Sequence, residues 1–271
     1  MNTEIREPAV AGRFYSADAR RLEQDLAHLL EPAAVESAAV ALVAPHAGYM
    51  YSGAIAGAGY ARVLVPSRAI VLCPNHTGLG VERSIWSRGA WRLPGGDVAV
   101  AEELAASVRE AARLEDDALA HLREHAIEVQ LPFLRARRRD VRVVPICLSR
   151  LSYAGCVAVG EGLARALEAD PVAERPLLVA STDLSHYISA ERASELDRLA
   201  LERVTALDPR GLYEVVTRHD ISMCGYIPTT VTLVAACALG ATRATLVRYG
   251  NSGEASGDFD RVVGYASVVV S

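Results

Sequence analysis

Three histidines, His46, His76 and His186, stand in the same kind of position, just past a short apolar run that is typical of a buried strand. The three runs are Ala41–Ala44, Ile70–Cys73 and Leu177–Ser181. In open α/β sheets, ligands bind outside the carboxyl ends of the strands. Three imidazoles brought to one such edge would make a metal site, so we expect these histidines to converge on one metal ion.

Asp183 and Cys224 are the candidates for further groups in this pocket. Asp183 comes three residues before His186, so the two would share a face on a helical turn. Its carboxylate could ligate the metal, orient an imidazole through its ring N–H, or cap the following helix. Cys224 precedes Gly225 in a short polar turn and could be a site thiol or a buried spacer. We expect both residues to border the pocket.

His125 opens an amphipathic segment and shares a helical face with Glu128, which could hold its ring. Imidazole titrates near working pH, so a histidine here that faces the metal without ligating it could act as acid and base. The alternative is a surface helix start, where acidic residues interact well with the helix dipole. The peripheral histidines, to which we assign no role, are His28, His121 and His219.

The composition narrows the class of protein. The chain has 271 residues, of which 51% are apolar, and a net charge of −5, so we expect one large core and no nucleic-acid partner. It contains no lysine, which excludes lysine Schiff-base chemistry and a P-loop lysine. Cys73 and Cys147 lie in strand-like runs and no C-x-x-C occurs, which favours a reducing compartment. Without a signal-peptide pattern or a membrane-length apolar stretch, we expect a soluble, cytoplasmic protein with no membrane association.

Apolar runs alternate with helical patterns along the chain. The expected strands are 40–44, 69–73, 141–148, 177–181, 244–249 and 262–270; the expected helices are 18–30, 55–63, 98–114, 125–138, 153–168, 190–206, 210–218 and 229–239. This order predicts a single α/β domain over residues 1–271, with a central, mostly parallel or mixed sheet and helices on both faces. The last two strands are joined without a helix, so they are either antiparallel neighbours or separate insertions into the sheet. The motifs of serine hydrolases, dinucleotide-binding proteins and zincins are absent.

At its motifs the chain resembles the Memo family, the group also called AmmeMemoRadiSam system protein B. The matching segments are Pro8–Tyr15, Ala44–Tyr49, Pro74–His76, Glu124–Glu128 with Leu131-Pro132, Ser181–His186, Cys224-Gly225, Tyr249–Asp258 and Val263–Ala266. They run from residue 8 to about residue 266, so the resemblance covers nearly the whole chain.

The resemblance implies a fold similar to the class III extradiol dioxygenases, which use non-haem Fe(II). The family's metal-pocket histidines fall on His46, His76 and His186. Asp183 and Cys224 fall on pocket neighbours, and Cys224 is itself a candidate ligand. His125 lies in a segment similar to the one that holds the acid–base histidine of those dioxygenases. The leading interpretation is therefore a Memo-like non-haem iron protein, with a dioxygenase-like oxidoreductase activity as its expected chemistry.

Two other interpretations stay open. The common Fe(II) oxygenase site has two histidines and one carboxylate, whereas three neutral histidines also suit Zn²⁺ with a bound water. A zinc hydrolase is therefore one alternative, and copper is a further candidate ion. The other alternative is a non-catalytic module that binds a peptide or a redox partner in the same pocket. In each case we expect a small-molecule or peptide ligand at the metal, and the group's name points to protein partners of the AmmeMemoRadiSam system.

Overall fold

Four parallel strands form the centre of the main sheet in the computed structural model, which describes residues 4–30 and 36–271. In spatial order they are β2 (Ala41–Ala44), β9 (Leu177–Ser181), β3 (Arg68–Pro74) and β8 (Arg142–Leu148). Apart from the arginine that opens β3 and the one that opens β8, every residue of these strands is buried. Strands covered on both faces are continuously apolar, which is why the apolar runs predicted them.

Antiparallel strands extend this centre into a mixed sheet. β12 (Val262–Val270) pairs with β2 on one side and with β11 (Ala244–Asn251) on the other, so the last two long strands are antiparallel neighbours, as one of the two predicted arrangements requires. The short strands of the sheet are β4 (Arg83–Ile85), β7 (Glu115–Asp116) and β10 (His186–Ile188). The predicted α/β class with a mixed sheet is confirmed.

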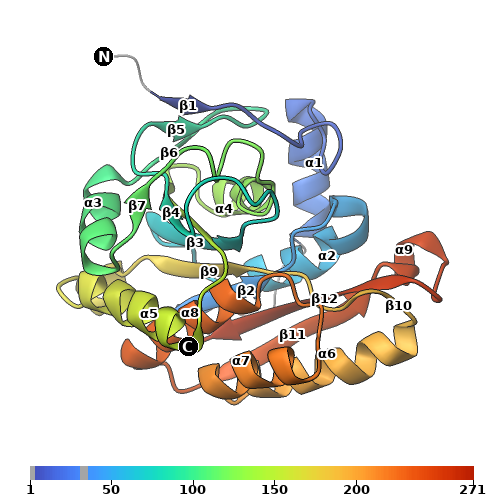
Figure 1. The fold of residues 1–271 in the computed structure, drawn as a ribbon. Coiled ribbons are helices and arrows are strands. Elements are labelled where there is room, and N and C mark those ends of the chain that lie inside the picture. The colour runs from blue at the N-terminus through green and yellow to red at the C-terminus, as the bar shows by residue number, and fades with distance from the viewer. Residues whose placement is uncertain (1–3, 31–35) are drawn as a thin grey trace.

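A separate three-stranded sheet lies at the top of Figure 1. Its strands are β1 (Ile5–Arg6), β5 (Ala90–Trp91) and β6 (Val98–Ala99). Two-residue strands carry no readable periodicity, so the sequence did not predict them. β6 also occupies residues that were predicted as helix, and α3 begins only at Glu102.

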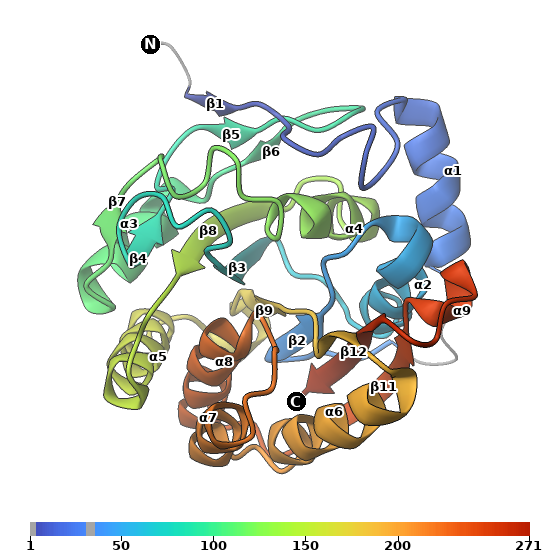
Figure 2. The ribbon, with the colours of Figure 1, turned by 45° about the vertical axis from the view of Figure 1, so that its right-hand side comes forward.

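Helices cover both faces of the main sheet (Figure 2). They are α1 (Ala19–Leu29), α2 (Tyr49–Tyr60), α3 (Glu102–Ala111), α4 (Leu131–Arg137), α5 (Tyr153–Leu167), α6 (Ala190–Thr205), α7 (Pro209–Arg218), α8 (Tyr226–Ala238) and α9 (Gly253–Ser256), with 3-10 turns η1 (Glu128–Gln130) and η2 (Val172–Glu174). α2 packs on β2, β11 and β12 and contacts α1 and α4, whereas α8 packs on β3 and β9 and contacts α5 and α7. Within the described residues, no helix is both long and apolar enough to cross a bilayer.

Two predicted helices beside the candidate site begin at other residues in the structure. α2 starts at Tyr49, immediately after the His46 loop, and six residues before the predicted start. The predicted helix over residues 125–138 is a turn, then η1 and α4. It is delayed because the Glu124 carboxylate accepts hydrogen bonds from the backbone N–H groups of His125 and Ala126.

The carboxyl edge of the central strands positions the candidate site. β2, β9 and β3 are adjacent and run parallel, so the segments that follow them leave the sheet side by side. Each of these segments contains a predicted site residue: His46 after β2, Asp183 after β9 and His76 after β3.

Candidate metal centre

His46 is buried at the end of β2 and is held through its Nδ1 atom. Ser181 Oγ lies 3.0 Å from Nδ1, donates its own proton to the carbonyl of Ala126 (2.6 Å), and accepts a hydrogen bond from Gln130 Nε2 (2.9 Å). Since the hydroxyl has only one proton to donate, Nδ1 must be the donor to Oγ. The Nε2 atom of His46 therefore carries a free lone pair. Burial, followed by the nearby His76, lowers the pKa of His46 to about 3, so the ring is neutral.

His76 is held in the same way by Glu124. The Glu124 carboxylate is fully buried and accepts hydrogen bonds from His76 Nδ1 (2.9 Å) and from the His76 backbone N–H (2.7 Å). A carboxylate only accepts, so Nδ1 carries a proton and Nε2 is the ring atom left for a ligand. Burial lowers the pKa of His76, but the hydrogen bond and charge of Glu124 outweigh it and the pKa is raised. Burial raises the pKa of Glu124, but His76 and the neighbouring N–H groups outweigh it and hold that pKa at about 2.

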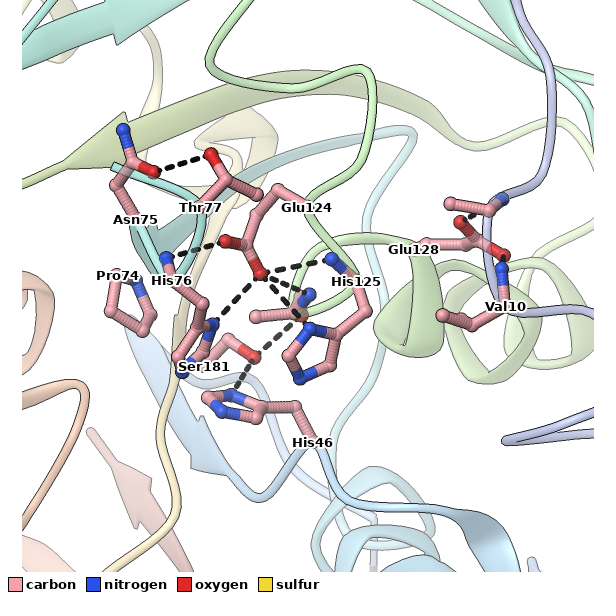
Figure 3. Close-up of polar contacts among 12 residues, drawn as sticks. Val10, His46, Pro74, Asn75, His76, Thr77, Glu124, His125, Glu128 and Ser181 are labelled. Carbon is pink, nitrogen blue, oxygen red and sulfur yellow. Dashed lines mark hydrogen bonds and ion pairs between the residues drawn. The ribbon is translucent and has the colours of Figure 1, made fainter. Parts of the chain in front are cut away.

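His125 completes a cluster of three rings that lie close together (Figure 3). One ligand atom from each of His46, His76 and His125 lies within 4.8 Å of the other two. The ring centroids are 5.1 Å apart for His46 and His76, 5.3 Å for His46 and His125, and 4.7 Å for His76 and His125. Burial, followed by His46, lowers the pKa of His125 to about 4, so this ring is neutral as well. The three-histidine cluster has the donors to hold a metal ion.

The sequence named His186 as the third histidine, and the structure places it outside this cluster. His186 opens β10, and its Nδ1 atom donates to the carbonyl of Ser222 (2.8 Å), which leaves Nε2 free. It is close enough for its charge to lower the pKa of His46. Asp183 and His186 do not share a helical turn, because no helix includes residues 182–186. Their spacing of three residues therefore said nothing about a common face.

Asp183 and Cys224 both border the pocket. The buried Asp183 carboxylate accepts a hydrogen bond from the His46 backbone N–H (2.8 Å), and its second oxygen lies 4.0 Å from His46 Nε2. It does not cap the next helix, where Ser189 is the N-cap residue of α6. Cys224 Sγ lies 3.3 Å from His46 Nε2. Burial, followed by Asp183, raises the pKa of the Cys224 thiol well above its ordinary value.

The two glutamates of the His125 segment have different partners, and the predicted role of Glu128 belongs to Glu124. The prediction that Glu128 holds the His125 ring is wrong, because its carboxylate accepts hydrogen bonds from Arg6, from the backbone of Ala9 and Val10, and from the Tyr15 hydroxyl. Glu124 Oε1 lies 3.3 Å from His125 Nδ1 instead. Glu124, Ser181 and Gln130 are therefore site residues that the sequence reasoning missed. The only signal for Glu124 was its place in a motif with two acids and one histidine.

The fold and the site define the class: an α/β protein with a histidine cluster, suited to a metal ion, at the carboxyl edge of its sheet. Comparisons with known proteins identify the family. A family model described as Memo-like protein matches residues 6–269. A MEMO1 family protein of Methanosarcina mazei is 41% identical over 269 residues, covering 98% of this chain and 99% of that protein. A MEMO1 family protein of Aquifex aeolicus is 38% identical over 268 residues, covering 98% of each chain. The chain belongs to the Memo family.

Proposed function

We propose that this pocket binds Fe(II) and that the protein is a non-haem iron oxidoreductase, similar in its chemistry to the class III extradiol dioxygenases. The observation that carries the proposal is the arrangement of His46 and His76. Each ring is held at Nδ1 by an outer partner, which leaves Nε2 as the atom of each ring that can bind a cation. Outer hydrogen bonds of this kind fix the tautomer and orientation of metal-binding histidines.

The residues present fit a metal ion, with Cys224 as the third ligand in our proposal. Its Sγ atom lies 3.3 Å from His46 Nε2, a spacing that suits two donors on one ion. A thiolate also supplies the negative charge that three neutral imidazoles would lack. Imidazole and thiolate ligands both suit iron, zinc and copper. His46, His76 and Cys224 would hold the ion, and Asp183 would lie beside it.

The other residues of the pocket then have distinct tasks. The metal would supply the binding and activation of O₂ and of a chelating substrate. His125, neutral because its pKa is about 4, can accept a proton from an acidic hydroxyl of that substrate. Glu124 Oε1, 3.3 Å from Nδ1 of His125, would stabilise the protonated ring. Phe14 packs against the His125 ring, with centroids 4.9 Å apart, and limits its rotation.

Anaerobic purification followed by metal analysis tests the proposal. We expect one iron per chain in the wild type, and loss of iron in His46→Ala, His76→Ala and Cys224→Ser. His219→Ala is the matched control, because His219 is exposed and should leave the iron content unchanged. His125→Ala should keep the metal and lose any turnover; loss of iron in that variant would make His125 a ligand in place of Cys224. A wild-type protein that takes up no iron would contradict the proposal.

A zinc hydrolase is the second candidate, and the same ligand set favours it. Two imidazoles and one thiolate are ligands that Zn²⁺ commonly takes, and bound Zn²⁺ lowers the pKa of water to about 7. Zinc in the anaerobically purified protein, with no iron, would favour this function. A pocket that binds a peptide or redox partner without turnover would leave a non-catalytic module. The same proposal includes a small-molecule or peptide ligand and protein partners of the AmmeMemoRadiSam system. It also includes a cytoplasmic setting that keeps Cys224 reduced.

A further inference from the structure

Arg6 is a buried arginine whose guanidinium makes its hydrogen bonds to one loop, residues 121–128. Only 1% of its side-chain surface is exposed. Its Nε and Nη2 atoms donate to the His121 carbonyl (3.2 and 3.1 Å), Nη2 also donates to the Glu124 carbonyl (2.6 Å), and Nη1 pairs with the Glu128 carboxylate. The guanidinium carbon, Cζ, lies over the Trp91 ring, 4.4 Å from the ring centroid. A buried charge is tolerated only when its hydrogen bonds are satisfied, and here residues 121–128 satisfy them.

The same loop presents its opposite side to the metal pocket. The Glu124 carbonyl binds Arg6, whereas the Glu124 carboxylate binds His76. His125 is the next residue. Two hydrogen bonds therefore connect the Arg6 guanidinium to the His76 ring. Without Arg6, the buried Glu124 carbonyl would lose its donor, and the His121 carbonyl and the Glu128 carboxylate would each lose one of several donors. Keeping the loop in this conformation would then cost free energy.

The segment that carries Arg6 also reaches the His46 loop. The carbonyl of Phe14 accepts a hydrogen bond from the backbone N–H of Tyr49 (2.7 Å), and the ring of Phe14 packs on His125. The Tyr15 hydroxyl donates to Glu128 (2.7 Å). Residues 6–15 thus join two of the three loops that carry the site histidines, although none of these residues is a candidate ligand.

We propose that Arg6 is a positioning residue of the metal centre: it fixes the 121–128 loop so that Glu124 holds His76 in its Nδ1–H form and His125 faces His46. The link to metal binding rests on the proposed function, whereas the link to the His76 ring does not. By reciprocity, a metal ion that is held better with this loop in place also holds the loop better. Arg6 therefore connects docking of the N-terminal segment to metal loading.

The test uses the full chain with Arg6→Met and Arg6→Lys. Arg92→Met is the matched control, because the Arg92 side chain pairs with Glu7 of the same segment (2.7 Å) and with Asp97 (3.2 Å) instead of with residues 121–128. The first measurement is the tautomer of His76 in the metal-free protein, from long-range ¹H–¹⁵N NMR of the ring. We expect the Nδ1–H form in wild type and Arg92→Met, and a mixture with the Nε2–H form in Arg6→Met.

The second measurement is titration with Co²⁺, followed by its visible absorption. Loss of an outer partner of a metal site typically weakens binding about 10–100-fold, and we expect that loss and an altered Co²⁺ spectrum in Arg6→Met. Arg6→Lys keeps the charge but not the fork of donors, so its effect should be intermediate, and it replaces Arg6→Met if that variant does not fold.

A folded variant with wild-type tautomer, affinity and spectrum would overturn the inference and leave Arg6 as a structural residue only. If wild type binds no Co²⁺ and no iron but the tautomer still changes in the Arg6 variants, the positioning role stands and the proposed function fails.

Discussion

Gly225 lies so close to the end of β9 that a methyl group there should displace Cys224. A Cβ atom at Gly225 would lie 2.4 Å from Thr182 Cβ and 2.6 Å from the Ser181 carbonyl oxygen. β9 pairs with β2 on one side and β3 on the other, so it cannot yield. To reach ordinary contact distances, the turn that carries Cys224 must move by about 1 Å.

The magnitude follows from two opposing effects of Gly225→Ala. Overpacking against a fixed backbone costs about 1–3 kcal/mol. The lower entropy of the unfolded chain with alanine stabilises by about 0.4–1 kcal/mol. Because the contact is with a central strand, we expect overpacking to dominate and the free energy of unfolding to fall by about 1–2 kcal/mol. Moving Cys224 Sγ away from its 3.3 Å contact with His46 Nε2 should also weaken metal binding.

Gly48→Ala is a matched control for this substitution. Gly48 and Gly225 are both N-cap residues without a side-chain cap, at φ −55° and −98°, so the cost of alanine at a cap is common to both. The nearest atoms to a Cβ at Gly48 lie 3.7 Å away, which is ordinary contact. Urea denaturation and Co²⁺ titration of both variants measure the difference. Equal stabilities within about 0.5 kcal/mol and equal Co²⁺ affinities would refute the reasoning, since surface-type changes stay within that range.

Three further predictions concern the pocket and its surroundings. Asp183→Asn keeps the shape but removes the charge beside His46, so we expect metal affinity to fall about 10–100-fold, as measured by Co²⁺ titration; unchanged affinity would show that the charge is not needed. Cys237 is exposed, so in a Cys237→Ser background a thiol reagent should label Cys224 before any other cysteine, and bound metal should slow that labelling. Burial lowers the pKa of His121 to about 3, so the unfolded chain takes up this proton below pH 6.5 while the folded chain does not. Between pH 7 and pH 5 this should remove about 2 kcal/mol of stability, and urea denaturation of His121→Gln should show a correspondingly flatter pH dependence.

The sequence was sufficient to predict the place of the site. His46 and His76 each follow a continuous apolar run, and such runs form the adjacent parallel strands of a buried sheet. The residues that follow these strands therefore meet at one edge of the sheet because of the topology alone. Their place can be predicted without knowing any side-chain contact. The same reasoning placed Asp183 in the pocket, because it follows the strand between the other two.

The partner of each polar side chain could not be predicted in the same way. Glu124 and Glu128 are both near His125 in the sequence, but their partners lie at His76 and at Arg6, 48 and 122 residues away. Spacing on a helix says which side chains share a face and not which distant segment packs there. The predicted helical face shared by His125 and Glu128 does not form, because the Glu124 carboxylate accepts hydrogen bonds from the backbone of residues 125 and 126 and the helix begins later in the chain.

The choice of third histidine depended on a similarly local feature. His186 is the first residue of β10, whose pairing with β12 is irregular between His186 and Ile188, and Tyr187 between them has a φ of +59°. A single residue in the left-handed region redirects the chain, and neither strand periodicity nor the motif indicates it. His125 reaches the cluster from a turn that the sequence pattern had marked as a helix.

The pH dependence of metal binding should decide between a thiolate ligand and a third histidine. His46 and His125, with pKa values of about 3 and 4, are already deprotonated at neutral pH and release no proton when a metal binds. The Cys224 thiol has a pKa raised far above its ordinary value, so it must release one proton to ligate. If Cys224 is a ligand, the Co²⁺ affinity should rise about tenfold per pH unit between pH 7 and pH 8 through the thiol proton alone, and this part of the rise should disappear in Cys224→Ser. His76, whose pKa is raised by Glu124, contributes its own proton release, and this contribution should remain in Cys224→Ser, so the difference between wild type and Cys224→Ser isolates the thiol. An affinity that is flat between pH 7 and pH 8 in the wild type would exclude the thiolate and favour His46, His76 and His125 as the ligand set.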